Sequence, residues 1–426
     1  MLTANQTATL VIFVATYVAI VAAHKWKLPI VLGACALVLL WPGLMSVPAA
    51  LRAVNWNVVM LYFGMLLVTE TLVISGAPKV LAEKLIRHGA SARFVIVLVC
   101  LLSGLISSVV ENVAVVLIVA PIALAAAKRL KVSPVPILVG IAVSSNLQGA
   151  ATMIGDPPSM LLAGALNMNF NDFFWYLGRP SVFFAVELGA VAATLVLWFI
   201  FRKHEGQAPP QEGHKLQSAV PVALLVLLIV GLACSSVALP GWTSATGVIP
   251  VVIGAASALW WIRHHRARRF FRQLWQLDWG TGLFIIGIFV LVGSVIENGL
   301  VERFVEVLAG LSGQGVFVAF SLLVWGSVAG SAFIDNVPFV AAMLPVCAGL
   351  AQKLGVPPEL FAFGMVIGAS VGGNITPIGA SANIVACGIA KREGYHVSFR
   401  EFAAIGLPFT IAGVAAAYLF LWWFWR

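Results

Sequence analysis

The chain has 426 residues, of which 61% are hydrophobic and 10% charged, and its mean hydropathy is +1.02. This composition excludes a water-soluble globular protein. The formal charge of +9 is dispersed over many short polar segments, which argues against a nucleic-acid-binding protein. The five cysteines stand singly in apolar segments without CxxC spacing, so we expect no disulfide framework, zinc site or cofactor.

Apolar runs long enough to span a membrane recur along the chain and predict an all-α polytopic membrane protein. Ten crossings are expected, near residues 7–23, 29–44, 57–75, 134–167, 180–201, 219–237, 243–261, 280–296, 360–390 and 404–424. Segments 94–127 and 314–352 are expected to enter the bilayer and turn back as re-entrant hairpins. Crossings 134–167 and 360–390 are too long for one straight helix and carry glycine and proline in their middles, so each is predicted to be broken.

The two halves of the chain repeat each other. Matched polar residues such as Ser107 and Ser331 lie 224 positions apart. The expected organisation is repeat 1 over 1–201, a cytoplasmic linker over 202–218 and repeat 2 over 219–426. Each repeat would hold five transmembrane helices, one of them broken, and one re-entrant hairpin. An odd number of crossings inverts the second repeat relative to the first, which is typical of secondary transporters.

The basic residues orient this topology. Of the 25 Lys and Arg residues, 20 fall in loops on one side of the predicted membrane, including the clusters at 79–93, 263–272 and 391–400. Loops rich in Lys and Arg are normally cytoplasmic, so both chain termini are expected to be periplasmic, in the inner membrane of a bacterium.

Two acidic residues occupy equivalent places in the two hairpins, and each precedes an asparagine. They are Glu111 with Asn112 in the first hairpin and Asp335 with Asn336 in the second. A buried charge at membrane depth is costly and usually has a task. Burial also favours the protonated carboxyl, and carboxylate and amide oxygens suit a hard cation. These four residues therefore predict proton or cation coupling, with Na⁺ as the alternative ion and simple helix capping as the alternative role.

The broken segments add a second group of polar residues. Asp156 precedes Pro157 and Pro158, and its repeat partner is Ala380, so it is a candidate for coupling or for capping the following half-helix. With the two hairpin asparagines, the residues expected to bind the solute are Thr152, Asn374, Thr376, Ser381 and Asn383.

These motifs resemble the ion transporter superfamily, in particular its arsenite permease and sodium/proton antiporter branch. The resemblance rests on the segments Ser331–Pro338 and Gly372–Asn383, supported by Gly155–Pro158. It implies a scaffold subdomain and a transport subdomain made of the hairpins and broken helices. The dicarboxylate carriers of this superfamily have Ser-Asn-Thr at their hairpin tips, whereas this chain has acid-Asn-Val, and we find no cationic residue in a predicted span.

The leading hypothesis is therefore proton-coupled efflux of arsenite or antimonite, an arsenical resistance function, by alternating access. A Na⁺/H⁺ antiporter and an inorganic or organic anion permease are the alternatives, followed by a channel. The sequence shows no nucleophile–base motif, so we do not expect an enzyme. Partners compatible with this hypothesis are membrane lipid, a second copy in a homodimer and a soluble arsenite-stimulated ATPase subunit, but no nucleic acid.

The topology predicts sided labelling. A cysteine replacing Lys128 should react with an impermeant thiol reagent only from the cytoplasmic face, because it follows the first hairpin in a basic loop. A cysteine replacing Lys353 should react only from the periplasmic face. Labelling of both from one face would contradict the inversion of the repeats.

Overall fold

The computed structural model describes residues 2–86, 91–130, 132–203, 216–239, 241–264, 274–275, 277–313 and 315–426. The predicted linker therefore lies mostly outside the described residues, as does most of the basic cluster at 263–272. The first half contains α1 (Ala4–Ala22), α2 (Lys27–Leu40), α3 (Val47–Ala53), α4 (Trp56–Ile74), α5 (Ala77–Ile86), α6 (Ala92–Ser107), α7 (Asn112–Leu130), α8 (Val135–Gly149), α9 (Pro157–Leu166), β1 (Trp175–Tyr176), β2 (Arg179–Pro180) and α10 (Val182–Ile200).

Among the described residues of the second half, all the regular elements are helices. It contains α11 (Val220–Ala238), α12 (Ala245–His264), α14 (Trp279–Glu297), α15 (Leu300–Leu311), α16 (Val316–Ser331), α17 (Asn336–Leu354), α18 (Glu359–Gly372), α19 (Ser381–Arg392) and α20 (Phe399–Trp425). Single 3₁₀ turns occur at His24–Trp26, Asn171–Phe173, Phe201–Lys203 and Gly373–Ile375.

The chain is an all-helical polytopic membrane protein apart from one short strand pair. Within the described residues, eight helices are long and apolar enough to cross a bilayer: α1, α4, α10, α11, α12, α14, α17 and α20. Shorter apolar helices make up the hairpin pair α6–α7 and the half-helices α8, α9 and α18. The strands β1 and β2 form an antiparallel two-residue ladder that the sequence analysis did not predict.

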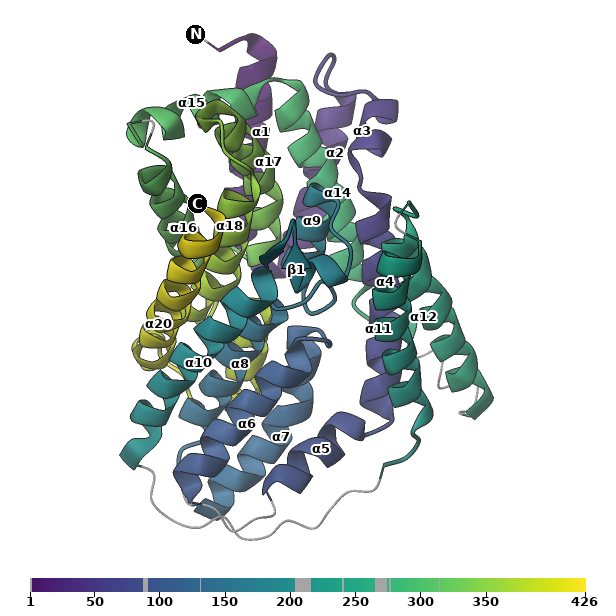
Figure 1. Cartoon of the computed structure of the whole chain (residues 1–426), viewed down its shortest axis with the longest axis vertical. Coiled ribbons are helices and arrows are strands. Elements are labelled where there is room, and N and C mark those ends of the chain that lie inside the picture. The colour runs from purple at the N-terminus through teal and green to yellow at the C-terminus, as the bar shows by residue number, and fades with distance from the viewer. Residues whose placement is uncertain are drawn as a thin grey trace.

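The two long segments with central glycine and proline are interrupted at those residues. Helix α8 ends at Gly149 and α9 begins at Pro157, while α18 ends at Gly372 and α19 begins at Ser381. Proline at the first positions of α9 suits a helix start because its missing N–H would have no partner there. Figure 1 shows the pair α6–α7 at the lower end of the molecule and α15–α17 at the upper end.

Two segments assigned to loops from the sequence are helices, which corrects that assignment. They are α5, which overlaps the basic stretch at 79–93, and α15, around Arg303. In α15 the residues Val301, Val305 and Ala309 are buried at four-residue spacing, while the charged side chains lie on the other face. A two-sided helix of this kind lacks the continuous apolar run by which spans are recognised.

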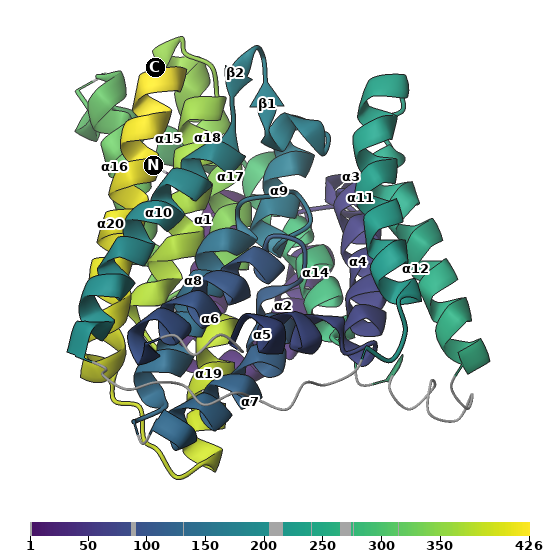
Figure 2. The same ribbon diagram turned by 60° about the horizontal axis from the view of Figure 1, so that its bottom comes forward.

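Helices from the two halves pack directly against each other. Figures 1 and 2 both show α4 beside α11 and α12 on one side of the molecule, with α10 and α20 on the other. A Cβ built on Gly254 of α12 would lie 2.8 Å from the carbonyl oxygen of Gly64 on α4, and one on Gly189 would lie 2.6 Å from that of Gly413. Small residues let membrane helices approach this closely.

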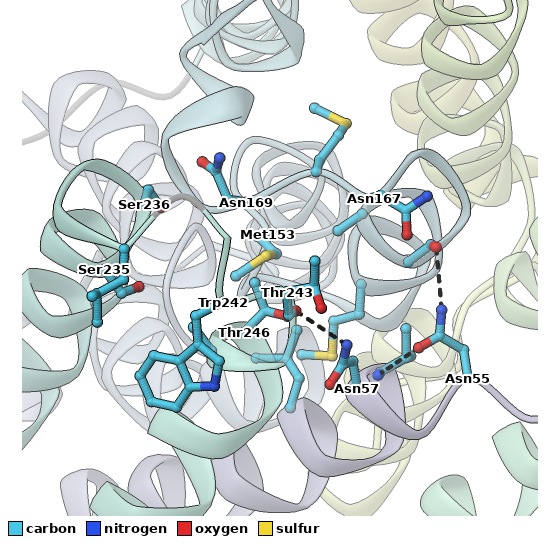
Figure 3. Close-up of a pocket in the computed structure, with 18 residues that line it drawn as sticks. Asn55, Asn57, Met153, Asn167, Asn169, Ser235, Ser236, Trp242, Thr243 and Thr246 are labelled. Atoms are coloured by element: carbon cyan, nitrogen blue, oxygen red, sulfur yellow. Dashed lines mark hydrogen bonds between the residues drawn. The ribbon is translucent and has the colours of Figure 1, made fainter.

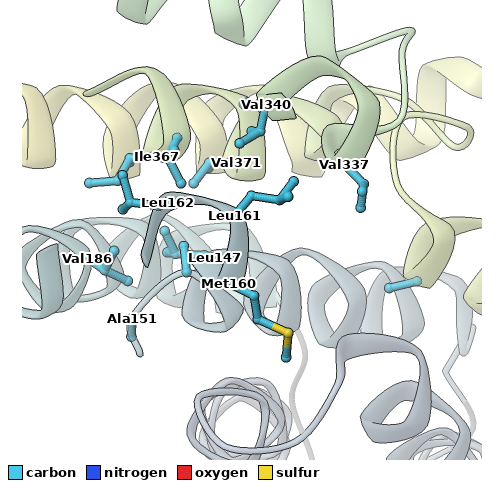
Figure 4. Close-up of a cluster of buried hydrophobic side chains, with 14 of the residues drawn as sticks. Leu147, Ala151, Met160, Leu161, Leu162, Val186, Val337, Val340, Ile367 and Val371 are labelled. Carbon is cyan, nitrogen blue, oxygen red and sulfur yellow. The ribbon is translucent and has the colours of Figure 1, made fainter. Parts of the chain in front are cut away.

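An apolar layer joins the half-helix α9 to the second repeat. Figure 4 shows Leu161 and Leu162 of α9 facing Val340 of α17 and Ile367 and Val371 of α18. All five side chains are buried. The first broken segment is therefore packed against the second hairpin and the second broken segment, which places the two breaks near one another.

The close α4–α12 crossing predicts a size limit at Gly64. Gly64→Ala should destabilise the protein by about 1–3 kcal/mol, because the added methyl meets the backbone of Pro250. Gly33→Ala on α2 is the matched control, since a Cβ there has nothing within 4 Å. Thermal unfolding of both variants in detergent measures the difference. Equal midpoints would contradict the crossing.

Candidate functional site

Both hairpin tips end in an acid that caps the helix after it. Glu111 accepts a hydrogen bond from the N–H of Ala114 at 3.1 Å, at the start of α7. Asp335 accepts one from the N–H of Val337 at 3.3 Å, at the start of α17. Both acids therefore cap a helix, which was the alternative role considered from the sequence. Each of these capping hydrogen bonds uses one carboxylate oxygen, and the other oxygen can make another contact.

Each tip is tied to the break of the same repeat by a threonine. The Thr152 hydroxyl donates to the carbonyl of Ser108, and the Thr376 hydroxyl donates to the carbonyl of Ala332 at 2.5 Å. Glycine allows the tip to come so close, because a Cβ on Gly379 would lie 2.8 Å from the Ala332 carbonyl oxygen. Both threonines, predicted to bind solute, thus have their hydroxyls engaged by hairpin backbone.

One asparagine links the two repeats. The Asn146 amide donates to the side-chain oxygen of Asn374 at 2.8 Å and to that of Asn383 at 2.9 Å. Its own side-chain oxygen accepts from the Asn112 amide at 3.2 Å. The first hairpin tip is therefore connected through one side chain to the break of the second repeat. The sequence analysis missed Asn146, because its repeat partner is Ser370 and the pair does not stand out as a match.

A cavity of about 410 Å³ lies between the two hairpin tips and α2, and we call it the charged cavity. Five of the ten predicted site residues line it: Glu111, Asn112, Asp335, Asn336 and Ser381. The other five, Thr152, Asp156, Asn374, Thr376 and Asn383, are buried outside this lining. No hydrogen bond of the Asn336 side chain to another described residue is found. Its amide is therefore open to a solute.

Cationic residues line the same cavity, although the sequence analysis found none in a predicted span. Lys27, in the first turn of α2, forms an ion pair with Asp335 at 3.1 Å, and His24 and Lys25 line the cavity beside it. The Asp335 side chain is 3% exposed and that of Lys27 is 20% exposed. Removing one partner of so buried a pair would leave the other charge uncompensated. The sequence analysis placed Lys27 in a loop, and nothing in the sequence joins positions 308 residues apart.

A smaller cavity of about 150 Å³ adjoins the charged cavity. We call it the acidic cavity, because Glu70, Glu111 and Asp278 line it. Glu111 and Asp278 line both cavities. Asp278 caps α14 through the N–H of Thr281 at 3.0 Å and its hydroxyl at 2.6 Å. The signal in the sequence for this cap is the position of Asp278 directly before a helix.

Asp156 is a fully buried cap with one oxygen left over. Its Oδ1 accepts from the Ser159 N–H at 3.0 Å and from the Ser159 hydroxyl at 2.7 Å. Its Oδ2 is buried without a hydrogen-bond partner among the described residues. Capping therefore uses half of this carboxylate, and a coupling role for the other half stays a prediction.

A metal centre is not evident in the part of the chain that the structure describes. There, no three His, Cys, Asp or Glu side chains gather in a way that would hold a metal ion. The Na⁺ site expected at Glu111, Asn112, Asp335 and Asn336 also draws on amide oxygens, so it stays a prediction.

The cross-repeat role of Asn146 generates a test with its own control. Asn146→Ala should lower the midpoint of thermal unfolding, because it leaves the buried amide groups of Asn112, Asn374 and Asn383 each short of a partner, at about 1–3 kcal/mol per buried orphaned group. Ser370→Ala, at the equivalent place in repeat 2, should not, because the Ser370 hydroxyl has no hydrogen-bond partner among the described residues. If both variants lower the midpoint of thermal unfolding equally, the hydrogen bonds of Asn146 do not contribute the expected stability.

Comparison with known proteins identifies relatives along the whole chain. An uncharacterised transporter of Mycobacterium tuberculosis is 31% identical over 433 residues, which cover 96% of this chain and 96% of that protein. The 46 kDa membrane protein of Mycobacterium leprae is 29% identical, over 96% of this chain and 97% of that protein. The human P protein is 25% identical over 88% of this chain, which corresponds to 54% of its own length.

The fold is also known from experiment. The crystal structure of the YdaH transporter of Alcanivorax borkumensis, described as having an unusual topology, matches with a TM-score of 0.61 over 98% of this chain and 97% of that one. Its sequence is 16% identical, so the likeness concerns the fold alone. These relatives make the chain a transporter rather than an enzyme. None of them specifies the arsenite permease branch. A family model described as citrate transporter matches residues 10–368 and 350–426, and the chain therefore belongs to the citrate transporter family (CitMHS).

Proposed function

We propose that this protein is a proton-coupled secondary transporter that carries a small, oxygen-rich acid across the bacterial inner membrane through the charged cavity. The observation that carries the proposal is the Lys27–Asp335 ion pair at 3.1 Å, between α2 and the tip of the second hairpin. Alternating access would move the hairpins and broken helices as one unit. The hydrogen bonds through Asn146 support this unit, because they tie α8 to the first hairpin and to the second break.

The ion pair offers a coupling mechanism. While the cavity holds no solute, Lys27 and Asp335 neutralise each other, which limits the cost of two charges at membrane depth. A proton on Asp335 removes its negative charge and leaves the Lys27 ammonium without a counter-ion. An anionic group of the solute can then take the place of Asp335. Proton and anion thereby bind together, and each depends on the other.

The first candidate solute is a small carboxylate anion, within the anion-permease alternative drawn from the sequence. Lys25 and His24 line the cavity beside Lys27 and add further donors for carboxylate oxygens. The family description as citrate transporter supports the same class. The open amide of Asn336 and the hydroxyl of Ser381 would orient the remaining oxygens.

Efflux of arsenite or antimonite is the second candidate. At neutral pH arsenite is mostly uncharged As(OH)₃, and Asn112, Asn336 and Ser381 supply amide and hydroxyl groups to the cavity. A proton arriving at Asp335 or Glu111 would then displace a solute whose hydroxyls were bonded to that carboxylate. The third candidate, Na⁺/H⁺ antiport, is favoured only by the oxygen-rich lining that Glu70, Glu111 and Asp278 give the acidic cavity.

Variants of the ion pair test the coupling. Asp335→Asn should retain exchange of solute across liposomes at equal concentrations but lose accumulation driven by a pH gradient, because an amide does not titrate. Lys27→Met should lower both the yield of folded protein and the flux, because it strands a buried carboxylate. The double variant should recover folded protein without recovering accumulation.

The assay compares citrate, arsenite and Na⁺ in liposomes of purified protein under an imposed pH gradient, and so ranks the three candidates. Arg303→Gln is the control, since it removes an exposed partner of Glu306 on α15 and should leave flux unchanged. If Asp335→Asn still concentrates the solute with the wild-type pH dependence, the ion pair is structural and the proposed coupling is wrong.

A further inference from the structure

A third cavity, of about 280 Å³, lies where the first turns of α4 and α12 meet the ends of α9 and α11. Figure 3 shows the side chains of Asn57, Asn167, Asn169, Trp242 and Thr246 around it. No Lys, Arg, His, Asp or Glu is among its described lining residues. We call it the amide cavity. Its volume, near the lower end of the usual range for ligand sites, suits a small metabolite.

Part of its polar lining is already used by the protein. Asn55 donates to the Gly164 carbonyl at 3.1 Å, and Ser235 donates to the Leu232 carbonyl at 2.9 Å. The side chain of Asn167, the hydroxyl of Thr246 and the indole N–H of Trp242 have no hydrogen-bond partner among the described residues. Asn167 and Trp242 are exposed, so the cavity presents donors and acceptors that can exchange water for a solute rich in oxygen.

The three cavities adjoin one another. Met160 of α9 lines both the amide cavity and the acidic cavity. The acidic cavity shares Glu111 and Asp278 with the charged cavity. They thus form a series along α9, which contributes Met160 to the amide and acidic cavities and Pro157 to the acidic and charged cavities.

We propose that the amide cavity is a second solute-binding site, separated from the acidic cavity by Met160, which takes a small oxygen-rich solute through neutral hydrogen-bonding groups alone. The inference rests on the proposed function for its solute class. Neutral hydrogen bonds are roughly half as strong as charge-assisted ones, so this site would hold the solute more loosely than Lys27 does. Loose binding suits a position where solute enters or leaves.

Protection of a cysteine reporter tests the site directly. In a Cys234→Ser background, Thr246→Cys places a thiol in the cavity wall, and its rate of modification by a maleimide is measured with the protein in lipid nanodiscs. Citrate and arsenite are the probes. We expect at least one of them to slow the modification threefold or more. Gly241→Cys, on the exposed turn just before α12, should react at an unchanged rate.

A second substitution locates the binding groups. Asn167→Gly removes the amide at a position whose φ is 53°, a conformation that glycine adopts freely, so the backbone is not strained. In the Thr246→Cys reporter it should raise the probe concentration for half-protection at least threefold. Ser235→Ala should not, because that hydroxyl is already bonded within α11.

The outcomes separate this inference from the proposed function. Transport of citrate or arsenite without protection of Thr246→Cys by either probe overturns the second site and leaves the proposed function standing. Protection without flux driven by a pH gradient supports the site and overturns the function. If neither protection of the cysteine nor flux driven by a pH gradient is seen, both the second site and the proposed function are overturned. Protection that Asn167→Gly and Ser235→Ala weaken equally also overturns the assignment of the binding groups.

Discussion

Backbone that leaves the helical conformation at membrane depth must find its hydrogen-bond partners inside the protein, and this requirement organises the centre of the molecule. Each hairpin tip turns in a short non-helical segment, and each broken span adds another. In each repeat, a threonine of the broken span donates a hydrogen bond to a carbonyl of the hairpin tip. The Thr152 hydroxyl donates to Ser108 and the Thr376 hydroxyl donates to Ala332. The glycines at the breaks follow from the same contact, because only they let the two backbones come so close.

The duplicated frame carries unequal polar groups, and function can be asymmetric for that reason. Asn146 makes three side-chain hydrogen bonds, two of them to the other repeat, while the hydroxyl of its counterpart Ser370 makes none among the described residues. Asp156 caps α9, and Ala380 precedes α19 without a side-chain cap. Symmetry therefore sets where the tips and breaks lie, and the individual side chains decide what each of them binds.

Much of this arrangement could be predicted from the sequence, because repetition and composition are local signals. Among the described residues, seven of the ten expected crossings coincide with helices long enough to span a membrane, and α17, expected as a hairpin arm, is an eighth. The interrupted segments and the acid–asparagine pairs follow from residues matched at a constant separation. The Lys27–Asp335 contact could not be predicted, since it joins the first turn of α2 to a hairpin tip 308 residues away in the sequence. Helix α15 was missed because its apolar residues lie on one face only. Thr152 and Thr376 were recognised as central, but the carbonyls they bind are set by tertiary packing.

The two hairpin acids, equivalent in sequence, differ in electrostatic setting. Asp335 is neutralised by Lys27, whereas no ion pair of Glu111 is found among the described residues. The charge of Glu111 must then be balanced by a proton, a mobile cation or its position at the start of α7. Protonating Glu111 releases no fixed cation, so it changes the charge of the cavity without creating a place for an anion. Protonating Asp335 does release one. Of the two acids, therefore, only Asp335 can make the binding of an anionic solute depend directly on the binding of a proton.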